Sequence, residues 1–98
     1  MAAEKTENRL EYKGHPLLRS GNELYYGSME KSHTVFMQVL SFDEIDGEEV
    51  AGKIHVQLLS NNPSLSPAAR ILKESDKQGL YNALDIAYIW LERALSGD

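Results

Sequence analysis

Three histidines, at His15, His33 and His55, are the side chains of this sequence best suited to acid-base chemistry near neutral pH. Their positions are too far apart in the chain for the short ligand spacing of a zinc site, and no nucleophile elbow accompanies them. The chain has no cysteine, which excludes disulfides, thiolate ligands and a cysteine nucleophile. An enzyme would have to use His55 with Lys53 and a nearby carboxylate, and this is the least supported of three hypotheses for function. The simpler interpretation is that all three are surface or turn histidines.

A second candidate site consists of Ser64, Ser66 and Arg70, within the segment SNNPSLSPAARIL at residues 60–72. Ser66 suits the N-cap position of a helix, and Pro67 suits the first helical position. The free N–H groups and positive dipole of such a helix, with the hydroxyls and Arg70, could hold a phosphate or carboxylate. Turn and cap formation alone also explain these residues, since no glycine-rich phosphate loop precedes them. An anion-binding domain is therefore the alternative function.

Five acidic residues gather within seven positions: Asp43, Glu44, Asp46, Glu48 and Glu49. Their spacing does not match the ligand positions of a calcium-binding EF-hand loop, and no helices are expected around them. Asp46-Gly47 is a typical turn pair, so we expect a solvated hairpin tip.

The overall charge limits the partners. The chain has 98 residues, ten of them Lys or Arg and 15 of them Asp or Glu, which gives a formal net charge of −5. The basic residues are scattered, and this argues against binding to nucleic acid or to an anionic membrane. The sequence contains neither a signal-peptide core nor a long apolar run, and we predict a cytoplasmic protein. We expect a flexible tail at residues 1–8 and a single domain at residues 9–98.

Alternating and β-branched residues predict about five strands in an antiparallel meander. RLEYKG is typical of a short first strand. Strands at 16–20 and 23–27 flank the Gly21-Asn22 turn, and long strands at 33–42 and 49–59 flank Asp46-Gly47.

Two helices are expected after the sheet. A short one runs from Pro67 to about Glu74, and Ser75 with Gln78 forms a capping box that opens the long C-terminal helix. At 100° per residue, half of the long helix is apolar and is expected to cover the sheet; it includes Ala83, Leu84, Ala87, Trp90, Leu91 and Tyr81. The predicted class is α+β, with both helices after the sheet.

Some apolar residues lie on faces that one helical layer does not cover. Phe36, Leu40 and Phe42 lie opposite Val35, Met37 and Val39 on the first long strand, while Ile86 and Ile89 lie on the polar side of the helix. They form an interface unless the short strands or the first helix cover them. The first hypothesis for function is therefore a small non-enzymatic intracellular interaction module that binds a protein partner or a second copy as a homodimer. No cofactor is expected.

Overall fold

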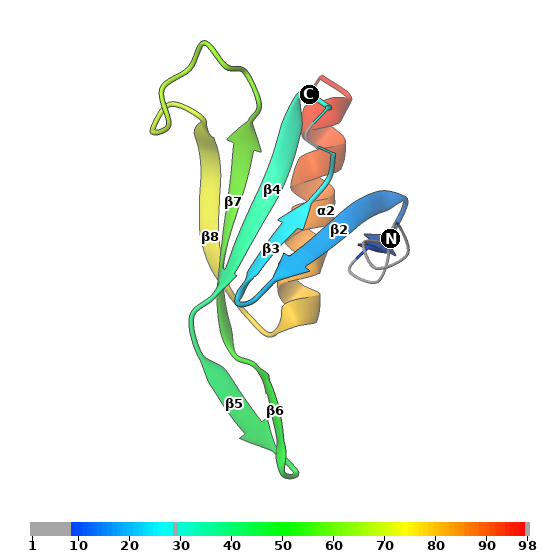
Figure 1. Ribbon diagram of the computed structural model, residues 1–98, viewed down its shortest axis with the longest axis vertical. Helices are drawn as coiled ribbons and strands as arrows, with labels where there is room; N and C mark the ends of the chain where they lie inside the picture. The colour runs from blue at the N-terminus through cyan, green and yellow to red at the C-terminus, as the bar shows by residue number, and fades with distance from the viewer. Residues whose placement is uncertain (1–8, 29, 98) are drawn as a thin grey trace, which may run out of the picture.

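A computed structural model describes residues 9–28 and 30–97, which form eight strands and one helix (Figure 1). The predicted tail at residues 1–8 lies outside this part of the chain. The helix, α2, spans Leu80–Leu95. The strands are β1 Arg9–Tyr12, β2 His15–Ser20, β3 Glu23–Tyr26, β4 His33–Val39, β5 Phe42–Ile45, β6 Glu48–Ala51, β7 Lys53–Ser60 and β8 Ile71–Gln78. The predicted α+β class is confirmed.

Six of the strands form one antiparallel meander in the order β1-β2-β3-β4-β7-β8. The predicted hairpin around Gly21-Asn22 joins β2 to β3, and Gly21 has the positive φ of 61° that favours glycine. The longest uninterrupted register pairs β4 with β7, from His33 opposite Ser60 to Val39 opposite Ile54. The sheet therefore has one strand more than the five expected.

The predicted strand at 49–59 is two strands, because the chain is interrupted at Gly52. Before this point β6 pairs with β5 in a separate two-stranded sheet, which projects from one end of the larger sheet (Figure 1). We call this hairpin, residues 42–51, the acidic arm. Its turn at Asp46-Gly47 was predicted, and both residues have positive φ, 54° and 80°.

The prediction of a short helix starting at Pro67 is wrong. Only a single turn forms there, in which the Arg70 amide donates to the Ser66 carbonyl at 3.1 Å and the Ala69 amide donates to Ser66 Oγ at 3.3 Å. From Ile71 onward the chain is β8, paired along β7. Backbone pairing to the free edge of β7 outweighs the modest helix propensity of this segment.

The predicted capping box of Ser75 and Gln78 is also wrong, since both residues belong to β8. The helix begins at Leu80, and its N-cap residue Gly79 makes no side-chain cap hydrogen bond.

Within the described residues, no helix is long and apolar enough to cross a membrane.

The hydrophobic core lies between α2 and one face of the sheet, and in Figure 1 the helix lies behind the strands. The helix supplies Ala83, Leu84, Ala87 and Leu91, as the helical periodicity predicts. Tyr81 is an exception: it is 81% exposed, whereas its neighbour Leu80 packs against the core. The strands supply Leu17, Leu24, Tyr26, Val35, Met37, Val39, Ile54, Val56 and Leu58.

Candidate interaction surface

The sheet face that α2 does not cover, which we call the open face, carries apolar side chains on three neighbouring strands. Leu18 on β2 is opposite Tyr25 on β3, and Tyr25 is opposite Phe36 on β4. The rings of Tyr25 and Phe36 are 5.1 Å apart between centroids. Leu18 is 47% exposed and Leu40, just after β4, is 51% exposed. The open face therefore carries an apolar strip, formed by Leu18, Tyr25, Phe36 and Leu40, that no helix covers in the described part of the chain.

Two of the five predicted interface residues, Phe36 and Leu40, belong to this strip. Phe42 follows the end of β4 and begins the acidic arm, where it is 39% exposed. Ile86 and Ile89 are elsewhere, on α2 in the opposite layer. Ile86 is half-buried and packs against the core, while Ile89 is 42% exposed. The two isoleucines therefore do not extend the same surface.

Leu18 and Tyr25 were missed as surface residues, although the sequence held a signal for them. Each stands beside a second apolar residue on the same strand, in the pairs Leu17-Leu18 and Tyr25-Tyr26. Successive side chains of a strand point to opposite faces, so an apolar pair places one side chain on each face. Leu17 and Tyr26 are in the core, which leaves their neighbours on the open face.

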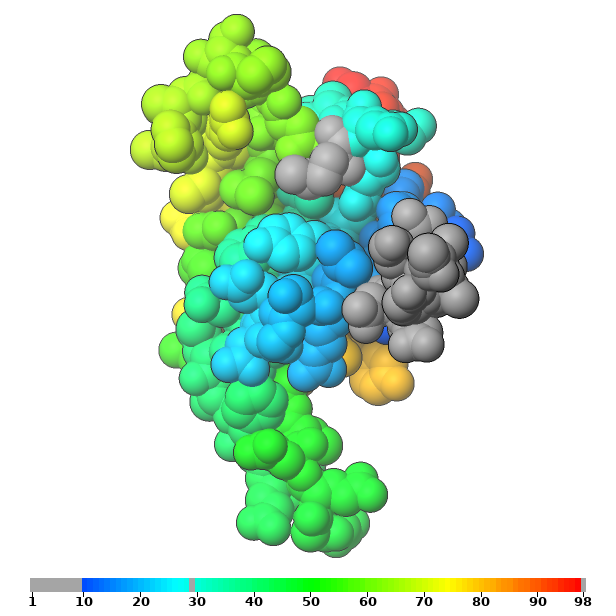
Figure 2. Space-filling model, in the orientation of Figure 1, coloured from blue at the N-terminus to red at the C-terminus, as the bar shows by residue number. Residues whose placement is uncertain are grey.

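The acidic arm holds the whole formal net charge of the protein. Its ten residues include five acidic and no basic side chains, and the remaining ten acidic residues balance the ten basic ones. Figure 2 shows the arm protruding from the body of the molecule. A charge concentrated on a projecting element produces a local negative field that attracts cationic groups.

A groove of about 570 Å³ separates the arm from the first turn of α2. It is lined by apolar side chains that are unusually exposed: Ile45 is 57%, Val50 is 37% and Tyr81 is 81% exposed. Asp43 also lines the groove, and its Oδ2 accepts a hydrogen bond of 3.2 Å from the Gln78 side-chain amide. The arm therefore presents apolar and acidic groups together.

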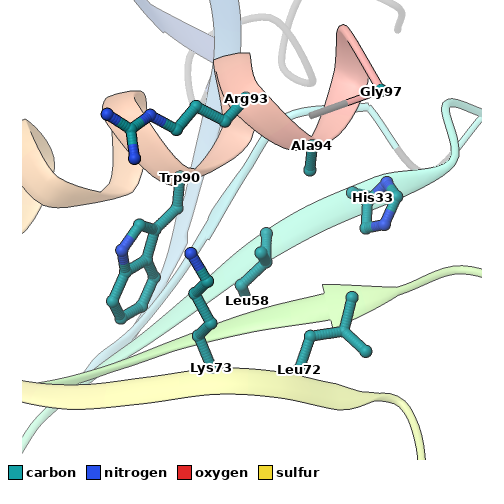
Figure 3. A pocket seen from close by; sticks show the side chains of 8 residues that line it. All are labelled: His33, Leu58, Leu72, Lys73, Trp90, Arg93, Ala94 and Gly97. Carbon is teal, nitrogen blue, oxygen red and sulfur yellow. The ribbon is translucent and has the colours of Figure 1, made fainter.

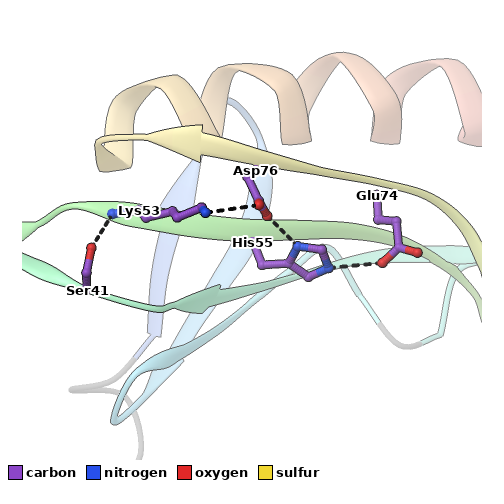
Figure 4. A network of polar contacts seen from close by, with 5 residues as sticks. All are labelled: Ser41, Lys53, His55, Glu74 and Asp76. Atoms are coloured by element: carbon purple, nitrogen blue, oxygen red, sulfur yellow. Dashed lines mark hydrogen bonds and ion pairs between the residues drawn. The ribbon is translucent and has the colours of Figure 1, made fainter.

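A polar cluster lies where β7 meets β8 on the open face (Figure 4). The His55 ring is hydrogen-bonded through Nδ1 to Asp76 Oδ1 at 2.6 Å and through Nε2 to Glu74 Oε1 at 3.0 Å. Lys53 Nζ lies 3.6 Å from Asp76 Oδ2, and the Gln57 amide donates to Glu74 Oε1 at 3.2 Å. Each carboxylate therefore has two partners on β7.

These contacts shift the pKa values in the directions expected for ion pairs. The hydrogen bond to Asp76, with a smaller contribution from Glu74, raises the pKa of His55, although partial burial opposes the shift. The hydrogen bond from His55 lowers the pKa of Asp76, and the hydrogen bond from Gln57 lowers that of Glu74, followed by the one from His55. The cluster therefore stabilises a protonated imidazole between two carboxylates.

The cluster brings together the His55, Lys53 and carboxylate of the enzyme hypothesis. Both ring nitrogens are bonded to carboxylates, so neither is free to accept a proton from a substrate in this arrangement. The nearby Ser41 Oγ accepts a hydrogen bond from the Lys53 backbone amide at 2.9 Å. Across residues 9–28 and 30–97, no group of three or more His, Cys, Asp or Glu could hold a metal ion. These contacts join β7 to β8, and we call the cluster of Lys53, His55, Gln57, Glu74 and Asp76 the clasp.

Ser64, Ser66 and Arg70 lie in the loop between β7 and β8. The Arg70 guanidinium donates to the Leu65 carbonyl at 3.1 Å and to the Pro63 carbonyl at 3.4 Å, which ties it to the loop backbone. A single turn has little of the macrodipole on which the anion hypothesis depended. The hypothesis stays a prediction that depends on the two hydroxyls and Arg70.

Comparisons with known proteins do not assign the chain to a class. No family model matches it, and neither the curated proteins nor the solved structures include a significant match. The fold is a two-layer α+β arrangement of one six-stranded sheet and one helix in the described residues.

Proposed function

We propose that the chain is a small cytoplasmic interaction module without catalytic activity, and that it binds a protein segment carrying both apolar and basic side chains. The observation that supports this proposal is the uncovered apolar strip of the open face, which leads through Leu40 and Phe42 to the acidic arm. Contiguous exposed apolar surface marks interfaces more often than isolated residues do. The partner's apolar side chains lie on the strip, and its basic side chains face the arm.

The arm supplies a second argument for a partner. A two-stranded hairpin is marginally stable alone in water, and this one exposes Phe42, Ile45 and Val50. An apolar segment bound along the arm would remove these side chains from water. Basic residues on that segment would be attracted by the five carboxylates of the arm, which outnumber Arg19, the one Lys or Arg that lines the adjoining groove.

A second copy is the alternative occupant of the open face. Two sheets can pack face to face, and an apolar strip is then complementary to itself across a two-fold axis. The net charge of −5 on each copy opposes this association, whereas it favours a basic partner. We therefore place a different protein ahead of a homodimer.

The test is binding of a short synthetic peptide of alternating leucine and lysine, measured by fluorescence anisotropy, with a leucine and glutamate peptide as its control. Replacing Leu40→Ser should weaken binding about fivefold, because part of an exposed leucine is buried in the complex. The matched control is Leu10→Ser, since Leu10 is 55% exposed but pairs with the core residue Leu17 on the other face. Equal binding of the two peptides, or equal effects of the two substitutions, would refute the proposal.

A further inference from the structure

A cleft of about 610 Å³ lies between the last turns of α2 and the first residues of β8 (Figure 3). The apolar part of its wall comes from Leu58 on β7, Leu72 on β8 and Trp90 on α2. Leu72 is 47% exposed, so the cleft is open to solvent on the β8 side. The volume is within the range of small-molecule sites in proteins.

Small residues at the end of α2 leave this space unfilled. Ala94, in the last turn of α2, and Gly97, just after the helix, line the cleft. β8 is the edge strand, so the sheet does not extend past the cleft. The cleft is therefore already formed in this structure.

Two cations border the cleft and no acidic residue lines it. Lys73 Nζ lies 5.9 Å from the centre of the Trp90 ring, a cation–π distance. Arg93 is three residues after Trp90, which places both on the same side of the helix. Within the described residues neither Lys73 nor Arg93 forms an ion pair, in contrast to Lys13 and Lys53, so both charges can face a ligand.

We propose that this cleft binds a small amphipathic anion. Its carboxylate or phosphate group lies between Lys73 and Arg93, and its apolar body lies against Trp90, Leu58 and Leu72. Charge-assisted hydrogen bonds from an ammonium and a guanidinium are the usual means of holding such groups. The cleft lies on the α2 side of the sheet, away from the open face, so this inference goes beyond the proposed function and does not depend on it.

The protein carries its own probe for this site, because Trp90 is its only tryptophan. Decanoate should change the intensity and emission maximum of Trp90 in a saturable manner. Decyltrimethylammonium has the same chain and the opposite charge, and it should produce no saturable change. An equal response to the two compounds would overturn the proposal, since it would show that only apolar surface is recognised.

Substitution of the cations tests the geometry. Lys73→Gln or Arg93→Gln should each raise the Kd for decanoate about tenfold, the usual effect of one lost charge-assisted hydrogen bond. The matched control is Lys77→Gln, on the same strand and lining a different groove, which should leave the Kd unchanged. Equal effects at the three positions would overturn the proposal and indicate general charge attraction.

Amide chemical shifts show where the anion binds, independently of the stability of any variant. Decanoate should perturb the amides of Leu72, Lys73 and Ala94. Perturbations confined to Tyr25 and Phe36 would mean that it binds the open face, and the proposal would be wrong.

The source of the anionic group can be distinguished with the same fluorescence signal. A response to decanoate or decyl phosphate in solution indicates a free metabolite. A response to phosphatidylglycerol vesicles, absent with phosphatidylcholine vesicles and with the soluble anions, indicates a lipid headgroup. No response to any anionic probe would refute the site.

Discussion

The imidazole of His55 on β7 and the carboxylate of Asp76 on β8 are joined by a hydrogen bond of 2.6 Å across the last strand pair of the sheet. Lys53 and Glu74 extend this contact along the two strands. β8 contributes no fully buried apolar side chain, so its side chains hold it to the sheet mainly through polar contacts. The stability of the edge strand should therefore depend on pH.

The first prediction concerns His55→Asn. The pKa of His55 is raised in the folded state, so its stabilising contribution is complete below the ordinary value of 6.5 and is lost as pH rises through the folded-state pKa. The pKa values of Asp76 and Glu74 are lowered from 3.8 and 4.5, so their contributions are lost on acidification. The substitution should therefore lower the Tm most between about pH 4.5 and 6.5, and its effect should decrease as pH rises through the raised pKa of His55.

The control for this prediction is His33→Asn, because His33 Nδ1 shares its hydrogen bond with Ser32 Oγ and not with a carboxylate. Thermal unfolding of both variants at several pH values provides the measurement. A Tm difference for His55→Asn that does not change with pH would show that the clasp is not ionic.

The second prediction concerns Gly27, just after β3. Its φ is 103°, and a Cβ at this position would lie 3.0 Å from Leu91 Cδ2 in the core. Gly27→Ala should lower the free energy of unfolding by about 3 kcal/mol through backbone strain and overpacking together. Urea denaturation measures the loss.

Gly21→Ala separates these two causes. Gly21 also has a positive φ, 61°, but a Cβ there would have no neighbour within 4 Å. It should cost about 1 kcal/mol, from backbone strain alone. Equal losses for the two variants would contradict the contact between Gly27 and Leu91.

The sheet could be predicted from sequence where one face is buried. Val35, Met37 and Val39 alternate along β4, and Ile54, Val56 and Leu58 alternate along β7. β8 has no such alternation, because an edge strand at the margin of the helix buries little on either face. Its lysines, glutamate and glutamine are good helix formers, so local propensity favoured the wrong element.

The candidate surfaces were predictable in part for a related reason. An apolar residue on the second face of a strand, such as Phe36, is visible in the sequence once the strand is assigned. The contact between His55 and Asp76 could not be predicted, since it requires the register of β8, for which the sequence pattern favours a helix and a helix start. The cleft at Trp90 depends on how α2 lies against β8, and residue spacing does not contain this information.

The third prediction concerns Tyr26, whose side chain is fully buried. Its hydroxyl donates a hydrogen bond of 2.6 Å to the Tyr12 carbonyl, and burial raises the pKa of this phenol well above its ordinary value. Tyr26→Phe leaves that carbonyl without this donor, and it should cost about 1 to 2 kcal/mol. Hydrogen exchange should also become faster at the amides of β1.

Tyr25→Phe is the comparison for Tyr26→Phe. Its hydroxyl donates to Glu23 at 3.3 Å on the open face, where water can replace the partner. The expected change is within about 0.5 kcal/mol. A similar loss of unfolding free energy in both variants would show that the hydrogen bond from Tyr26 to the Tyr12 carbonyl stabilises the fold no more than the exposed one of Tyr25.

The fourth prediction concerns self-association. If the open face binds a basic partner and not a second copy, light scattering should give the mass of a monomer over a dilution series at low ionic strength, where repulsion between copies is strongest. A dimer that persists at low micromolar concentration would show that a second copy occupies the open face. Leu18→Lys would then be expected to dissociate it.

The fifth prediction concerns the charge of the arm. Glu44→Gln together with Glu49→Gln removes two of its five negative charges, on the side of the hairpin that carries Phe42. Binding of the leucine and lysine peptide should weaken about tenfold at low salt, and its dependence on ionic strength should decrease, because fewer ion pairs form in the complex. Glu11→Gln together with Glu30→Gln makes the same change in net charge away from the arm. If this control weakens binding equally, total charge attracts the peptide and the position of the arm is irrelevant.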